Sequence, residues 1–132
     1  MIRGIAGVGS QVELIPVIAH AAATASELVP IWYAKFPCRV KAAYHVSPAI
    51  TGADTNTTHL NLINAGTDGT GTDEVGNIDY VMGTDQAASD PQSFGLTAFN
   101  LAAEETLVLQ YEKVGTGLAI PAGAIVLELE PM

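Results

Sequence analysis

Charged residues are scarce in this chain, and basic residues are the scarcest. Only 14% of the 132 residues are charged, with five Lys or Arg against 14 Asp or Glu and a formal net charge of −9. Soluble proteins ordinarily contain roughly 25% charged residues. An acidic chain repels the phosphate backbone of DNA and RNA, so we expect no nucleic-acid partner. The low charge density also leaves apolar surface for a partner to cover, which predicts a homo-oligomer.

The few basic residues are concentrated near the start of the chain. Up to Lys41 there are four basic and two acidic residues, whereas beyond it Lys113 is the only base among twelve acids. The N-terminal third therefore either faces an acidic partner or is an ordinary solvated surface, and the sequence leaves both interpretations open.

Cysteine and long hydrophobic runs are nearly absent. Cys38 is the only cysteine, which excludes an internal disulfide and fits a reducing compartment. The stretch FPCRV predicts the start of a strand with a buried structural thiol. No uninterrupted apolar stretch reaches the roughly 18 residues of a membrane span, so we expect no membrane partner. The first 25 residues loosely resemble a signal peptide, but Glu13 and Pro16 interrupt the apolar run, and we expect no secretion.

The residue types that perform catalysis show no recognisable arrangement. His20, His45 and His59 lie in separate segments and form neither H-x-H nor H-x-x-x-H, so they do not predict a metal site. No serine lies in G-x-S-x-G, and the adjacent acids Glu104 and Glu105 would point to opposite faces of a strand. We therefore predict no catalytic residues, no cofactor and no metal ion, and a protein that is not an enzyme.

One polar segment, INAGTDGTGTDEVGNID at 63–79, has the composition of a ligand-binding loop. Gly66 and Gly71 have the spacing of a phosphate-binding loop, but Thr72 stands where that motif needs lysine. Its acidic residues lack the alternate spacing of a helical calcium loop, and a calcium site of irregular geometry remains the alternative. We interpret the segment as a mobile connector between two strands, in which Gly permits positive φ and Asp and Asn cap turns.

Alternation of apolar and polar residues predicts strands along most of the chain. About eight short strands separated by Gly, Pro, Asp and Thr turns indicate an all-β antiparallel sandwich or a closed barrel. Pro16 and Pro30 cannot donate ladder hydrogen bonds, so their strands should be at edges or bulged. The stretch AHAAATASEL has no helical apolar stripe and predicts a loop or a single helical turn. The predicted inward residues are Val40, Tyr44, Leu60, Leu62, Leu107, Leu109, Ile125, Leu127 and Leu129.

The domain organisation is predicted as a flexible N-terminal arm, 1–10, followed by a single β domain, 11–132. In MIRGIAGVGS the apolar side chains are separated by glycines, and Arg3 is the only charge. An extended arm of this length could reach a neighbouring subunit and add a strand to an exposed sheet edge.

Two stretches, ITGADTNTTHLNLINAGTDGTGT and LAAEETLVLQYEKVGTGLAIPAGAIVLELEP, resemble small bacteriophage head proteins of the decoration, or cement, type with a jelly-roll domain. The resemblance lies in an N-x-G-T turn at 64–67 and a G-T-G-L-x-x-P turn at 115–121 that precedes a closing strand with alternating acids. It covers roughly residues 46–131 and contains no diagnostic site residues.

This resemblance implies an antiparallel jelly-roll β-sandwich that binds the outside of an assembled phage capsid and stabilises the coat lattice. It also implies a homotrimer, the major capsid protein as partner, synthesis in the host cytoplasm and a final location on the outer capsid surface of the virion. Under this interpretation the candidate intersubunit or capsid contacts are Ile2, Arg3, Ile5 and Val8 in the arm.

Other functions remain as alternatives. A receptor-binding head fibre or adhesin domain could use the Thr- and Gly-rich segment against a host glycan. The few aromatic residues argue against glycan binding, because sugars usually stack on exposed rings. A minor coat or tail structural subunit is a further alternative, and a small sugar-active or metal-dependent enzyme is the least supported.

Overall fold

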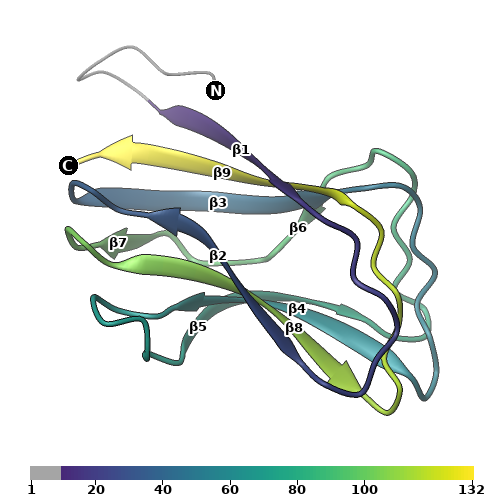
Figure 1. The fold of residues 1–132 in the computed structure, drawn as a ribbon. Coiled ribbons are helices and arrows are strands. Elements are labelled where there is room, and N and C mark those ends of the chain that lie inside the picture. The colour runs from purple at the N-terminus through teal and green to yellow at the C-terminus, as the bar shows by residue number, and fades with distance from the viewer. Residues whose placement is uncertain (1–9) are drawn as a thin grey trace.

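Two antiparallel sheets pack face to face in the computed structural model, which describes residues 10–132 (Figure 1). The five-stranded sheet has the order β1-β9-β3-β6, and β7 also pairs with β3. Its strands are β1 (Gln11–Val17), β3 (Cys38–Val46), β6 (Gln92–Ser93), β7 (Phe99–Leu101) and β9 (Gly123–Pro131). The four-stranded sheet has the order β2-β8-β4-β5. Its strands are β2 (Glu27–Tyr33), β4 (Thr57–Asn64), β5 (Asp73–Tyr80) and β8 (Thr106–Val114).

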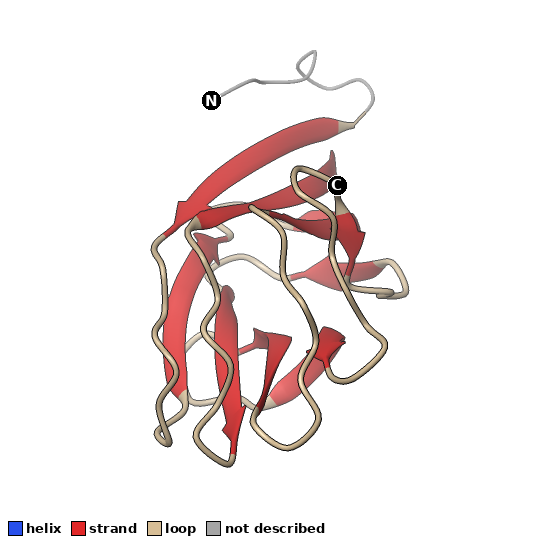
Figure 2. Cartoon of the chain, turned by 90° about the vertical axis from the view of Figure 1, so that its right-hand side faces the viewer, coloured by secondary structure: helices blue, strands red, loops and turns tan. Residues whose placement is uncertain are grey.

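The connectivity is that of a jelly roll. From β1 to β4 the chain changes sheet at every strand, and β8 and β9 again lie in different sheets. Strands β6 and β7 pair with opposite halves of β3, so the nine strands fill eight positions. This confirms the predicted all-β sandwich and excludes the closed barrel. Residues 10–132 contain no helix, and so none that could cross a membrane (Figure 2).

The proline-containing strands lie where the sequence predicts them. Pro16 is in β1 and Pro30 is in β2, and each of these strands is the edge of its sheet. The pairing of β2 with β8 is also shifted between Pro30 and Trp32. Proline is tolerated at both places because an edge or a bulge does not require its missing N–H.

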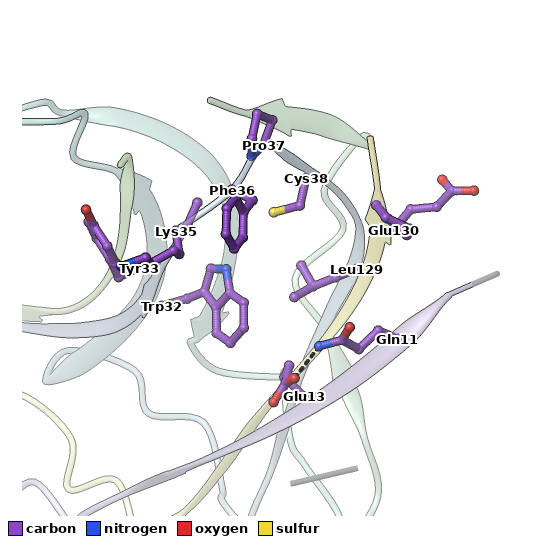
Figure 3. Close-up of a pocket in the computed structure, with 12 residues that line it drawn as sticks. Gln11, Glu13, Trp32, Tyr33, Lys35, Phe36, Pro37, Cys38, Leu129 and Glu130 are labelled. Carbon is purple, nitrogen blue, oxygen red and sulfur yellow. Dashed lines mark hydrogen bonds between the residues drawn. The ribbon is translucent and has the colours of Figure 1, made fainter. Parts of the chain in front are cut away.

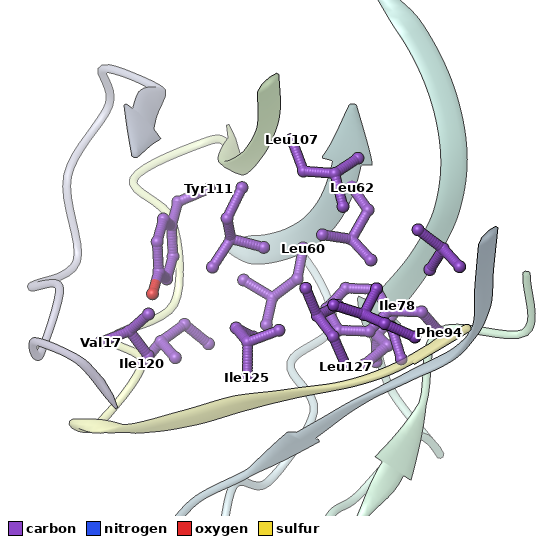
Figure 4. Packing of buried hydrophobic residues seen from close by; sticks show 14 of the residues in the cluster. Val17, Leu60, Leu62, Ile78, Phe94, Leu107, Tyr111, Ile120, Ile125 and Leu127 are labelled. Atoms are coloured by element: carbon purple, nitrogen blue, oxygen red, sulfur yellow. The ribbon is translucent and has the colours of Figure 1, made fainter. Parts of the chain in front are cut away.

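The inner faces of the two sheets form one hydrophobic core (Figure 4). Eight of the nine predicted inward residues are between 0% and 3% exposed, namely Val40, Leu60, Leu62, Leu107, Leu109, Ile125, Leu127 and Leu129. Tyr111 and Ile120 close the same core at one end. Each fully buried side chain of this size stabilises the fold by about 1.5–3 kcal/mol relative to an exposed one.

The ninth prediction, that Tyr44 faces the core, is wrong. The pairing of β3 with β9 shifts at Lys41, which has no counterpart on β9. One extra residue in a strand exchanges the faces of all residues that follow it. Ala43 and His45 are therefore buried, and Tyr44 is half-buried on the outer side.

Residues 65–72 of the Thr- and Gly-rich segment connect β4 to β5, whereas the rest of the predicted connector, 63–64 and 73–79, belongs to these two strands. Its glycines Gly66 and Gly69 have φ values of 73° and 78°, which residues with a Cβ rarely adopt. Asp68 Oδ1 accepts hydrogen bonds from the backbone N of Thr70 at 3.0 Å and from its hydroxyl at 2.8 Å. These two bonds lower the pKa of Asp68 and close the turn from within.

Candidate functional site

The outer face of the five-stranded sheet is apolar over three strands. Leu14 on β1 pairs with Val126 on β9, which pairs with Tyr44 on β3, so these side chains form one row across the sheet. Leu14 is 62% exposed although it is a leucine. We call this surface the outer apolar face. It consists of Val12, Leu14, Pro16, Tyr44, Val46 and Val126, and Glu128 on β9 lies beside Val12 on the same face.

A shallow depression of about 190 Å³ lies on this face, and Tyr44, Val46, Pro91 and Val126 line it. No lining residue carries a charge. Ile18, which follows β1, is also 74% exposed. Contiguous exposed apolar surface is uncommon on a soluble monomer and is typical of a protein contact site.

The face is bordered by charged residues at one end. Arg39 on β3 pairs in register with Glu130 on β9, and the neighbouring Lys41 is exposed. An apolar centre with a charged rim is the usual composition of a protein–protein interface. The mildly basic N-terminal third, which the sequence left uninterpreted, thus contributes to this rim.

The outer face of the four-stranded sheet is different, because polar side chains cover β4, β5 and part of β8. His59 Nδ1 lies 3.0 Å from Asp79 Oδ1 and 3.8 Å from Glu112 Oε1. Asn61 donates from Nδ2 to Gln110 Oε1 at 2.9 Å and to Glu112 Oε1 at 3.2 Å. These side chains bond to one another and form a polar, acidic surface.

A groove of about 360 Å³ lies at the edge of the sandwich, between β1 and β2 (Figure 3). Trp32 and Phe36 form one wall, and Leu129 lies on the opposite wall. The single cysteine, Cys38, is half-buried here, and burial raises the pKa of its thiol. A raised pKa favours the protonated thiol, but Cys38 lines the groove and is not buried as predicted.

Glu13 places a buried carboxyl group in this groove, which Lys35 and Glu130 also line. It is only 3% exposed, and the side-chain amide of Gln11 donates a hydrogen bond to it. No Lys, Arg or His side chain of residues 10–132 forms an ion pair with it. Gln11 and Glu13 lie on the same, inward side of β1, and Glu13 is the more buried of the two.

The three histidines are not brought together. His20 stacks on Tyr111 with ring centroids 3.7 Å apart and pairs through Nδ1 with Glu27 at 2.8 Å. His45 lies in the core, and His59 lies on the polar outer face. Within residues 10–132, no three His, Cys, Asp or Glu side chains are arranged to hold a metal ion.

The predicted contact residues of the N-terminal arm, Ile2, Arg3, Ile5 and Val8, lie outside the described residues. Neither the outer apolar face nor the groove was predicted. The stretch QVELIPV does contain a signal for the first, because apolar residues occupy both alternating sets of positions. A strand that is apolar on both faces is expected to be covered on both.

The chain was also compared with known proteins. No protein-family model matches it, and no curated protein matches it.

Proposed function

We propose that this chain is a non-enzymatic structural protein of a bacteriophage virion, which decorates the outside of the assembled capsid as an oligomer. The observation that carries this proposal is the contrast between the two outer faces. The five-stranded sheet presents the outer apolar face, whereas polar and acidic side chains cover β4, β5 and part of β8 in the four-stranded sheet, with Leu28 exposed on its edge strand β2. One outer face of such a sandwich would contact a protein surface, and the other would face solvent.

The outer apolar face is the part that we assign to the coat lattice. Burying exposed apolar side chains such as Leu14 and Val12 contributes about 25 cal/mol per Å² removed from water. Its rim residues Arg39 and Lys41 add the charges that orient a contact. With net charge −9 and the acidic face outward, particles coated with this protein would repel one another.

Stabilisation of the lattice follows from mass action. A protein that binds the assembled lattice, but not free coat subunits, stabilises the lattice by about 2.7 kcal/mol per site at a hundredfold excess over its Kd. A homotrimer that contacts several coat subunits at once multiplies this effect through its effective concentration. Such a role needs no catalytic group and no cofactor.

The test is binding to empty capsids that lack this protein, measured by co-sedimentation. Leu14→Asp should weaken binding about 30-fold or more, because a charge replaces an exposed apolar contact of the face. Leu28→Asp is the matched control, since Leu28 is 63% exposed on β2, in the other sheet. Absence of binding by the wild-type protein, or equal binding by the two variants, would reject the proposal.

A further inference from the structure

The loop 81–91, which connects β5 to β6, is anchored by Gln86. This residue is only 2% exposed. Its Nε2 donates hydrogen bonds to the backbone oxygens of His45 at 2.9 Å and Asp90 at 3.0 Å, and its Oε1 accepts one from the Tyr80 hydroxyl. Since His45 is on β3 and Tyr80 is on β5, Gln86 holds the loop against both sheets.

His45 is the group in this network that mild acid would change. Its Nδ1 lies 2.8 Å from the Tyr80 hydroxyl oxygen, which donates to Gln86 and therefore accepts from Nδ1–H. The other ring nitrogen, Nε2, is buried and has no hydrogen-bond partner among residues 10–132. A second proton on the ring would thus place a charged donor in the core without an acceptor, which is strongly unfavourable.

No neighbouring charge offsets this cost. Tyr80 on β5 is the titratable group that faces His45, and burial raises the pKa of Tyr80, so its hydroxyl remains neutral. No Asp or Glu side chain of residues 10–132 forms an ion pair with His45. The acids of the loop itself, Asp85 and Asp90, are exposed. The residues paired with His45 on β6 and β9 are uncharged, namely Gln92 and Ile125.

The loop also forms part of the outer apolar face. Pro91 is its last residue and lines the 190 Å³ depression on that face beside residues of β3 and β9. Two of these, Tyr44 and Val46, are the immediate neighbours of His45 on β3 and lie on the opposite side of the strand. Movement of the loop would therefore remove one wall of the depression.

We infer that His45 is an acid-sensitive switch, whose protonation releases the loop 81–91 from the sandwich and from the outer apolar face. Gln86 Oε1 lies 3.3 Å from His45 Nδ1, so departure of the loop opens the imidazole ring to water, which solvates the charge. Ser89 in the same loop has a φ of 62°, which is unfavourable for a residue with a Cβ, and release of the loop relieves this strain. The inference does not depend on which partner covers the outer apolar face.

The size of the effect follows from proton linkage. Burial lowers the pKa of His45 in the closed form below its ordinary value of 6.5, whereas the hydrated ring of the open form titrates near that value. As pH falls below 6.5, the open form binds a proton that the closed form does not, and the opening equilibrium constant rises up to about tenfold per pH unit. Between pH 7.5 and pH 5 the rise amounts to about 30-fold.

Amide hydrogen exchange of the full-length protein, measured by NMR and corrected for the intrinsic pH dependence of exchange, tests the inference. The reporter amides are those of Gln86, which bonds to Ile50 O at 2.8 Å, and Ser89, which bonds to Ser47 O at 2.9 Å. Their protection should decrease about 30-fold from pH 7.5 to pH 5. At both pH values they should be less protected than the amides of β8, which lies inside its sheet and reports on unfolding of the whole domain.

Two pairs of variants separate the switch from general destabilisation. His45→Gln should abolish the pH dependence of the reporter amides, because glutamine does not titrate. Its matched control, His59→Gln on the polar outer face, should retain that dependence. Gln86→Leu should reduce the protection of the Ser89 amide about tenfold already at pH 7.5, because the anchor of the loop is lost. Its control, Gln110→Leu on β8, should leave that amide unchanged.

The exchange data can overturn the inference in two ways. Reporter amides that are as strongly protected as those of β8 would show that the loop opens only when the whole domain unfolds. An equal loss of protection in the wild type and in His45→Gln would show that another group controls the loop, and Gln86→Leu provides the test if His45→Gln does not fold. Capsid binding is measured separately, so its absence would reject the proposed function and leave this inference to the exchange data.

Discussion

His45 Nδ1 lies 2.8 Å from the hydroxyl oxygen of Tyr80, and this contact joins the two sheets through the core. His45 is on β3 of the five-stranded sheet and Tyr80 is on β5 of the four-stranded sheet, and both are 0% exposed. The Tyr80 hydroxyl donates in turn to Gln86 Oε1, while Gln86 Nε2 donates to the backbone oxygen of His45 at 2.9 Å. The network assigns the proton of the neutral imidazole to Nδ1, because the Tyr80 hydroxyl oxygen must accept.

This arrangement predicts a stability loss in mild acid. Burial lowers the pKa of His45 below its ordinary value of 6.5. Below pH 6.5 the unfolded chain therefore binds a proton that the folded chain does not, so the free energy of unfolding falls as pH falls. The free energy of unfolding decreases by up to about 1.4 kcal/mol per pH unit until the pH reaches the pKa of His45 in the folded protein. Urea denaturation between pH 7.5 and pH 5 measures it.

The variant His45→Gln isolates this contribution from the other histidines. It should be less stable than the wild type at pH 7.5, but the difference between the two should shrink as pH decreases. His59→Gln, on the polar outer face, is the control. It should keep the pH dependence of the unfolding free energy that His45 produces. A constant difference between His45→Gln and the wild type across this range would contradict the prediction.

Leu109→Ala should cost about 2–5 kcal/mol of unfolding free energy, because it leaves a cavity in a packed core. Leu109 is 0% exposed and pairs in register with Leu62 on β4. Leu28→Ala is the control, since Leu28 is 63% exposed, and it should change stability by less than about 0.5 kcal/mol. Equal losses in chemical denaturation would mean that the assigned inner face of β8 is wrong.

Lys113→Met should lower stability by about 1–3 kcal/mol, because it removes a donor from buried acceptors. Lys113 Nζ lies 3.3 Å from the backbone oxygens of both Ala21 and Leu118 and 3.4 Å from the hydroxyl of Thr58. The ammonium group thus ties two loops to the end of the sandwich. Burial lowers the pKa of Lys113, because desolvation disfavours its charged form, while Glu27 acts in the opposite direction.

Lys35→Met is the matched control for this substitution, because Lys35 is exposed. It should change the free energy of unfolding by no more than about 0.5 kcal/mol. The prediction for Lys113 fails if both variants unfold at the same urea concentration as the wild type.

Removal of divalent cations should leave the melting temperature unchanged. The turn between β4 and β5 is closed by the hydrogen bonds of Asp68 with Thr70, so its geometry does not depend on a cation. Calorimetric scans with EDTA and with added calcium provide the measurement. A melting temperature that rises by several degrees with calcium would support the alternative of an irregular calcium site in this segment.

Gly71→Ala should be more destabilising than any change at the tip of the same turn. A Cβ at position 71 would lie 2.8 Å from the carbonyl carbon of Ala65 and 2.9 Å from the backbone oxygen of Asn64. At Gly69 nothing lies within 4 Å, and Asn tolerates its positive φ. We expect a loss of about 1 kcal/mol or more for Gly71→Ala and a smaller one for Gly69→Asn, measured by thermal unfolding. The reverse order would contradict the described path of the turn.

The sequence by itself determined the strands whose alternation is uninterrupted. In β8 and β9 the inward residues Leu107, Leu109, Ile125 and Leu127 follow directly from a period of two, because successive side chains of a strand point to opposite faces. The prolines of β1 and β2 likewise indicated edge strands, because proline lacks the N–H that an interior ladder needs. These features depend only on residues that are adjacent in the sequence.

The tertiary structure alone decided where alternation breaks and which distant residues meet. The extra residue in β3 is defined by pairing with β9, and only that pairing turns His45 inward and Tyr44 outward. The groove likewise joins Glu13, Trp32 and Leu129, which come from three strands in two sheets. A period of two indicates which residues share a face, but not which strand lies beside it or which partner covers it. Those choices depend on packing between segments far apart in the chain, and no local pattern encodes them.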